Sequence, residues 1–274
     1  MCRVGGYGGI RGYLVAVGLA GVVGSGREKS LGRYRAFAAR DPRVLMGVEP
    51  QGAWGVGELL ALMAEKCGVS ADPRCVSGHD VIDPDRTVAA LDAFAERVAA
   101  VAQRGGSVLI GTGHPDRLLG FYGRLADALS AAGCTVLTLA QGRSVDITTR
   151  FGLRTHHLDY VRGVAVVREG DGERAGCATP VHSHSPLPVR VALGAAAAEG
   201  RPLPDLVIGD HGWVCGAGQL GFDAIGLADT DDPAVFVGQA EGAVAVAVPL
   251  DDGVCPDHYL PLARYVLNRA CLSQ

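Results

Sequence analysis

Short apolar runs alternate with segments of helical periodicity along most of this sequence. In the run Leu206-Val-Ile-Gly-Asp-His-Gly-Trp213, β-branched residues lead directly into glycine and polar residues, as in a buried parallel strand that ends in a turn. The predicted strands are residues 108–110, 134–139, 206–208, 224–227 and 244–248, and the predicted helices are residues 84–103, 115–132, 186–199, 215–222, 234–241 and 259–270. We therefore predict an α/β fold with a doubly wound, mostly parallel, Rossmann-like sheet.

The first quarter of the chain shows helical periodicity alone. Apolar residues recur at helical spacing over residues 12–23, 30–40 and 56–67. We therefore predict an N-terminal helical extension, residues 1–76, packed on an α/β domain of residues 77–274.

Caps and glycines mark other boundaries. Asp83 is expected to cap the long helix that begins at Pro84. Residues 151–158 and 163–167 have the pattern of short strands. Glycine-rich residues 1–10 and 170–176 are expected to be loosely ordered.

Composition excludes several classes of protein. The 274 residues carry a formal charge of -4 and no dense run of Lys or Arg, so nucleic acid is not an expected partner. The eight cysteines form no CxxC pair, which favours reduced thiols over a disulfide framework. The apolar segment 13–24 is shorter than the roughly 20 residues that a membrane-spanning helix needs. We expect a cytoplasmic protein without a membrane anchor.

Gly111-Thr-Gly-His-Pro115 lies where a predicted strand meets a helix. In this position, backbone N–H groups and the helix dipole favour a bound phosphate. We predict that Gly111, Thr112 and Gly113 contact phosphoryl oxygens, and that His114 lies beside them. The alternative is a tight turn with an incidental histidine.

His182-Ser-His184 places two imidazoles two residues apart, on the same side of an extended segment. Both could bind one metal ion or flank one phosphoryl group, with Ser183 between them. The alternative is a solvated loop in which Ser185 caps the helix that follows.

Asp210-His211 stands at the end of a predicted strand. An acid beside an imidazole can orient a general base, or both can bind a metal that activates water. Alternatively, Asp210 caps the next helix and His211 is buried with a backbone partner.

Asp229-Thr-Asp-Asp-Pro233 offers carboxylates that suit Mg²⁺. The slightly favoured alternative is that Asp231 or Asp232 caps the helix that begins at Pro233. Cys215 is expected to be structural, because position 221 is a glycine where a thiol phosphatase needs an arginine.

Several of these motifs together resemble a bacterial family of proteins catalogued as phosphatases. The resemblance covers most of the chain after about residue 28, and it implies hydrolysis of phosphate monoesters. The motifs are TGHP at 112–115, HSHSP at 182–186, DHGW at 210–213, DTDDPA at 229–234 with AEG at 240–242, and VPLDD at 248–252.

The resulting hypothesis is a phosphatase of small-molecule phosphate monoesters that uses a divalent metal, Mg²⁺ or Zn²⁺. Its expected catalytic residues are Asp210, His211 and His114; its substrate-binding residues Gly111, Thr112, Gly113, His182 and Ser183; and its metal ligands His182, His184, Asp210 and Asp229. The alternatives are a sugar-phosphate isomerase and a non-catalytic protein that binds a phosphorylated ligand, since glycine-rich loops at strand ends occur in both. The sequence leaves the oligomeric state open.

Overall fold

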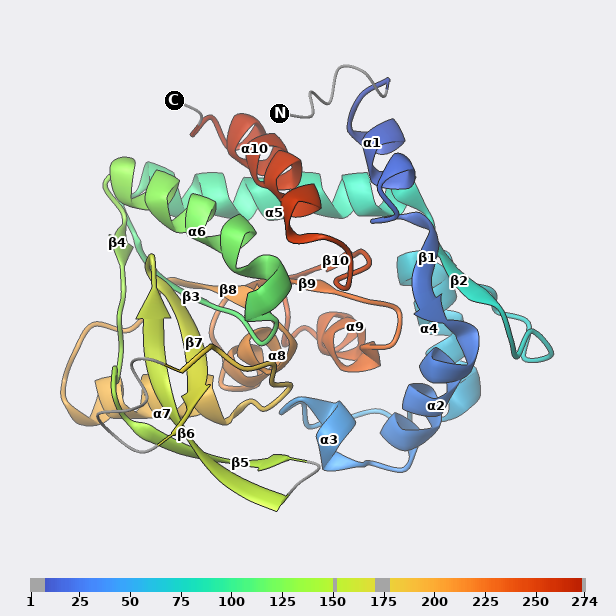
Figure 1. Ribbon diagram of the computed structural model, residues 1–274, viewed down its shortest axis with the longest axis horizontal. Helices are drawn as coiled ribbons and strands as arrows, with labels where there is room; N and C mark the ends of the chain where they lie inside the picture. Colours follow the sequence, from blue (N-terminus) through green and yellow to red (C-terminus); the bar gives the residue numbers. More distant parts are fainter. Residues whose placement is uncertain (1–7, 150–151, 171–177, 273–274) are drawn as a thin grey trace.

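The computed structural model describes residues 8–149, 152–170 and 178–272 (Figure 1). The expectations for residues 1–10 and 170–176 lie mostly outside this part. No helix among the described residues is both long and apolar enough to cross a membrane. The described cysteines are free thiols, as predicted.

An eight-stranded, mostly parallel sheet forms the centre of the molecule. Strands β10, β9, β8, β3 and β7 follow one another in parallel, whereas β7, β6 and β5 form an antiparallel meander. Short strand β4 pairs with the beginning of β3, ahead of β7. The bounds are β3 Ser107–Gly111, β4 Thr135–Val136, β5 Ser144–Thr149, β6 Gly152–Val161, β7 Val164–Glu169, β8 Leu206–Asp210, β9 Ala224–Ala228 and β10 Val246–Pro249.

Helices cover both faces of this sheet, and a separate apolar core lies on each face. Along β3, Val108 and Ile110 pack with α5, α6 and α10, whereas Leu109 between them packs with α7, α8 and α9. This alternation follows from the two-residue period of a strand. The helices are α5 Pro84–Gln103, α6 Pro115–Ala131, α7 Leu187–Ala198, α8 His211–Gln219, α9 Pro233–Ala240 and α10 Leu260–Arg269, with a short 3-10 helix, η3 Pro256–Tyr259, before the last. The predicted mixed α/β fold with a mostly parallel sheet is confirmed.

The N-terminal region differs most from the prediction. It contains α1 Ile10–Ala16, β1 Gly21–Gly26, α2 Arg27–Ala38, α3 Pro42–Leu45 and α4 Val56–Cys67, and β1 pairs antiparallel with β2 His79–Ile82. The predicted helix over 12–23 is therefore wrong in its second half. Gly18 and Gly21 have φ of 76° and 82°, and this left-handed backbone ends a helix. The division of the chain at residue 76 stays a prediction, and the β1–β2 pair joins its two sides.

The ends of other elements differ from the predicted ones by a few residues. The predicted strand 134–139 shortens to Thr135–Val136, and α8 begins at His211 instead of Cys215. The predicted cap of α5 is confirmed, because the Asp83 carboxylate accepts a hydrogen bond from the Asp85 amide at 2.9 Å.

Candidate functional site

The carboxyl ends of four parallel strands lead into polar loops at one edge of the sheet. His114 follows β3, His211 follows β8, Asp229 to Asp232 follow β9, and Asp251 and Asp252 follow β10. The loop before α7 adds His182 and His184, and β1 and α2 close the side opposite. Together these segments line a cavity of about 530 Å³, at the place where α/β sheets hold their ligands. The polar side chains that line it belong to Ser25, Lys29, Arg33, His114, His182, His184, His211, Asp229, Asp231, Asp232, Asp251 and Asp252.

Four imidazoles form a compact cluster on one wall, in which the ring centroids of His114 and His211 are 5.9 Å apart. Ring centroids are 4.2 Å apart between His114 and His182, 4.9 Å between His182 and His184, and 4.2 Å between His184 and His211. This imidazole cluster joins three chain segments that are far apart in the sequence.

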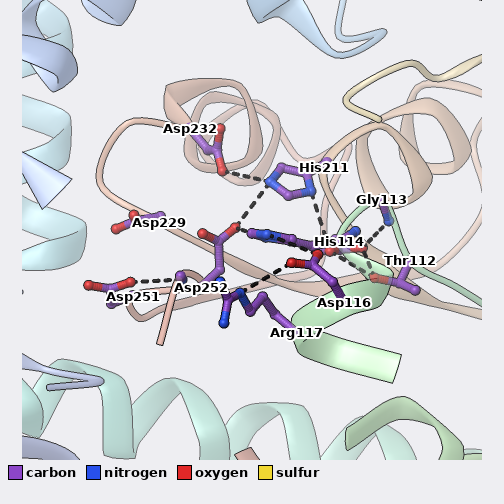
Figure 2. Close-up of polar contacts among 12 residues, drawn as sticks. Thr112, Gly113, His114, Asp116, Arg117, His211, Asp229, Asp232, Asp251 and Asp252 are labelled. Atoms are coloured by element: carbon purple, nitrogen blue, oxygen red, sulfur yellow. Dashed lines mark hydrogen bonds and ion pairs between the residues drawn. The ribbon is translucent and has the colours of Figure 1, made fainter. Parts of the chain in front are cut away.

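His211 is the most highly connected of them. Its Nε2 atom lies 3.2 Å from a carboxylate oxygen of Asp232 and 3.1 Å from one of Asp252 (Figure 2). The side chain is only 2% exposed, and its backbone is left-handed, with φ of 46°. For a non-glycine residue this conformation is strained, and such strain is found where side chains are positioned for function.

Asp210 lies behind this imidazole and outside the set of residues that line the cavity. One of its oxygens accepts a hydrogen bond from the Gly113 amide at 2.7 Å, and the other accepts one from the Thr112 hydroxyl at 3.1 Å. The second oxygen also lies 3.3 Å from Nδ1 of His211. Asp210 therefore holds the β3 loop and faces Nδ1 of His211, and its predicted roles in catalysis and in binding a metal stay predictions.

The β3 loop uses its amides within the fold. The Thr112 amide donates to the Ala165 carbonyl, the Gly113 amide to Asp210, and the His114 amide to the Thr112 hydroxyl. Contact of this loop with phosphoryl oxygens stays a prediction. The structure shows a different requirement for the glycines, which is the close packing of neighbouring groups against them. A Cβ atom on Gly111 would lie 2.3 Å from Trp213, and one on Gly113 would lie 2.2 Å from the Ser183 carbonyl.

Substituting Gly113 with alanine is expected to destabilise the protein, because the β3 loop and the loop that carries His182 would have to separate. Such overpacking costs about 2–3 kcal/mol, or roughly 5–10 °C in the melting temperature for a chain of this size. Thermal unfolding followed by circular dichroism measures it. Gly194→Ala on α7, where a Cβ meets no atom within 4 Å, is the matched control, and equal melting temperatures for the two variants would contradict the prediction.

Three carboxylates lie together beside the imidazole cluster. Oxygen atoms of Asp229, Asp251 and Asp252, one from each, lie within 4.8 Å of one another. Asp251 accepts hydrogen bonds from the Gly24 and Gly253 amides at 2.6 and 2.8 Å. Asp229 accepts a hydrogen bond from the Ser25 hydroxyl and another, at 2.6 Å, from the amide of Thr230. These contacts connect β1 to the ends of β9 and β10.

Burial and mutual repulsion make this group electrostatically unfavourable. Burial raises the pKa of Asp229 well above its usual range, and nearby Asp252 raises it further. Burial also raises the pKa of Asp232 to about 6, although His211 opposes the shift. Burial acts on Asp252 in the same sense, but hydrogen bonds from His114 and His211 outweigh it and hold that pKa well below its usual range. Like charges this close and this buried need protons or cations to neutralise them.

The pKa values of the imidazoles are shifted in opposite directions. Burial lowers the pKa of His182 to about 4, with His211 and His114 contributing, and lowers that of His184 well below the usual value. Burial would also lower the pKa of His211, but Asp232 and Asp210 raise it well above the usual value. His182 and His184 therefore present neutral nitrogen atoms to the cavity, as metal ligands do.

Two sets of side chains here have the arrangement of metal ligands. One nitrogen or oxygen atom from each of His184, His211 and Asp232 lies within 4.8 Å of the others, and the same holds for His114, His182 and His211. In addition, the buried Oδ1 atom of Asp232 has no hydrogen-bond partner among the described residues. The alternative role of Asp232 as a helix cap is wrong, because its side chain makes no capping hydrogen bond.

The structure thus brings half of the candidate residues named from the sequence to one cavity. His114, His182, His184, His211 and Asp229 line it, whereas Gly111, Thr112, Gly113, Ser183 and Asp210 lie outside its lining. The Ser183 hydroxyl accepts a hydrogen bond from the Ser185 amide at 3.2 Å.

Residues that sequence reasoning missed are Ser25, Lys29, Arg33, Asp251 and Asp252. The last two had a readable signal, because VPLDD is a strand that ends in two acids, like the stretch before Asp229. Lys29 and Arg33 had none, because only the packing of α2 brings them to the cavity.

Comparison with known proteins gives a consistent assignment. A family model described as "Phosphatase" matches residues 7–274. The chain is also 40% identical over 263 residues to "Phosphatase SCO2771" of Streptomyces coelicolor, an alignment that covers 95% of each chain. The similarity extends over the N-terminal region as well as the sheet.

Proposed function

The chain belongs to the phosphatase family, and we propose that it hydrolyses phosphate monoesters of small molecules in the cavity at the ends of β3, β8, β9 and β10, with the help of a divalent cation. The family supports phosphatase activity in general. The cavity supports the substrate class, because a volume of about 530 Å³ is that of a pocket for a small molecule.

The observation that carries the proposed use of a cation is the charge of the cavity. Five aspartates line it, against one lysine and one arginine among the described residues. Even with His211 protonated, the carboxylates outnumber the cations, and this wall repels a phosphate dianion. A divalent cation held by the wall reverses the local charge and makes the same cavity attractive to phosphate.

The donor atoms fit such a cation. His184, His211 and Asp232 combine nitrogen and oxygen donors, which suits Zn²⁺ or Mn²⁺, and the unpartnered Oδ1 of Asp232 is available for it. Asp229, Asp251 and Asp252 offer oxygen alone, which suits Mg²⁺. When bound, a divalent cation polarises phosphoryl oxygens and lowers the pKa of water.

Residues of the chain itself position His211 for its proposed role. Asp210 accepts hydrogen bonds from the Thr112 hydroxyl and the Gly113 amide, and one of its oxygens lies 3.3 Å from Nδ1 of His211, behind the ring. An imidazole with a buried carboxylate on its far nitrogen keeps one tautomer and one orientation. We assign to His211 the central role in binding and to Asp210 the role of a positioning residue.

Removal of divalent cations is expected to lower the rate of phosphate release by at least about 100-fold, because the cavity then repels the substrate. Purified protein is treated with EDTA, dialysed, and assayed on a panel of phosphomonoesters with and without Mg²⁺, Mn²⁺ or Zn²⁺. Calorimetric titration of each metal into the depleted protein gives a second readout.

Full activity after depletion, with no metal detected by mass spectrometry, would contradict the proposed use of a cation. Consumption of a sugar phosphate without phosphate release would instead favour an isomerase. Tight binding of such an ester without any turnover would favour a binding protein.

A further inference from the structure

We infer that Lys29 and Arg33 form an anion-binding subsite at the mouth of the cavity, and that the substrate is a phosphate monoester with a second anionic group. This inference rests on the proposed function. The proposed function concerns the phosphoryl group, whereas the subsite would bind the part of the substrate that lies far from the reacting phosphorus.

The two cations project from one face of α2. They are four residues apart, which places them on successive turns of the same side of a helix. The start of the helix is firmly held, because the buried guanidinium of Arg27 binds the carbonyls of Ser70 and Cys75 at 2.5 and 3.0 Å and lies 3.3 Å from Asp80. The subsite is therefore built on a rigid element.

The side chains of Lys29 and Arg33 lie nearer the surface than that of His211. The side chains of Lys29 and Arg33 are 59% and 32% exposed, whereas that of His211 is 2% exposed. All three line the same cavity. A substrate whose phosphoryl group reaches the buried end therefore extends its remaining atoms toward the two cations.

Asp231 shows that this pair accommodates a carboxylate. Its side chain is 5% exposed, and one oxygen lies 2.9 Å from Nζ of Lys29 and 3.6 Å from Nε of Arg33. The carboxylate holds the two cations side by side through one oxygen, and Asp229 and Asp232 act on Lys29 from farther away. Because both cations stay partly exposed, each keeps N–H donors for a second anion, and the arrangement is already formed before binding.

Two substrates that differ in one group test this inference. Glycerol 3-phosphate and 3-phosphoglycerate differ by a hydroxymethyl group in place of a carboxylate. The protein is expected to show a kcat/KM at least about tenfold higher for 3-phosphoglycerate, mainly through a lower KM. In the Lys29→Gln, Arg33→Gln double variant, this ratio is expected to fall to about one.

The controls separate charge from folding. Arg35→Gln removes an exposed cation of the same helix that does not line the cavity, and it should keep the preference. Lys29→Arg retains the charge and should keep most of it. Equal kcat/KM values for the two substrates in the unmodified protein, or a preference that survives in the double variant, would overturn the inference while the proposed function stands.

If neither ester is hydrolysed, calorimetric binding of the same two esters to the metal-loaded protein still decides the question. Tighter binding of 3-phosphoglycerate that is lost in the double variant supports the subsite. Equal binding of the two esters overturns it.

Discussion

Replacing His211 with asparagine is expected to lower kcat/KM for phosphate release by at least about a thousandfold, with the protein still folded. His211 contacts Asp232 and Asp252 at 3.2 and 3.1 Å and belongs to two of the candidate ligand sets. The variant therefore loses a proposed metal ligand and the contact with two acids at once, and single groups of this kind contribute about 10²–10⁴ in rate. The measurement is phosphate release at saturating metal concentration.

Asparagine suits this test because the backbone of His211 is left-handed, with φ of 46°. Asparagine tolerates this conformation better than most residues. The matched control is His79→Asn, an exposed histidine on β2 that lies outside the cavity lining. A loss of less than tenfold for His211→Asn, with an unchanged melting temperature, would remove His211 from the centre of the site.

Most helices and parallel strands of the sheet could be predicted because their signals are local. Helix α5 has a cap at Asp83 and one apolar stripe, and β8 is a short apolar run that ends in polar residues. Since the carboxyl ends of parallel strands meet at one edge, the same pattern predicts that His114, His211 and Asp229 lie near one another. The structure places all three on one cavity.

What the sequence could not predict depends on packing between distant segments. The second half of the apolar stretch over residues 12–23 fits a helix or a strand by its sequence, and it is a strand because Val22 pairs with Val81. The direction of a side chain is also not local. Asp210 turns away from the cavity because the Gly113 amide and the Thr112 hydroxyl, 97 and 98 residues away, take its oxygens.

Replacing Asp252 with asparagine is expected to weaken binding of a divalent cation by at least tenfold and to lower phosphate release by about 100-fold or more. Asp252 lies between the two walls of the cavity: one of its oxygens is 3.1 Å from His211 and 3.4 Å from His114, and the carboxylate also belongs to the acidic set with Asp229 and Asp251. Asparagine has nearly the same shape, so the packing is kept while the charge and one ligand oxygen are lost.

Because a cation that binds only the folded protein raises its melting temperature in proportion to the logarithm of its relative concentration, the decisive readout is the increase in melting temperature when Mn²⁺ is added. This increase should shrink in Asp252→Asn and should be kept in Asp257→Asn, which changes an exposed acid five residues further along the chain and outside the cavity lining. An equal increase in both variants would mean that Asp252 does not bind the cation. Any loss of activity would then have to result from a changed orientation of His211, with which Asp252 is in direct contact.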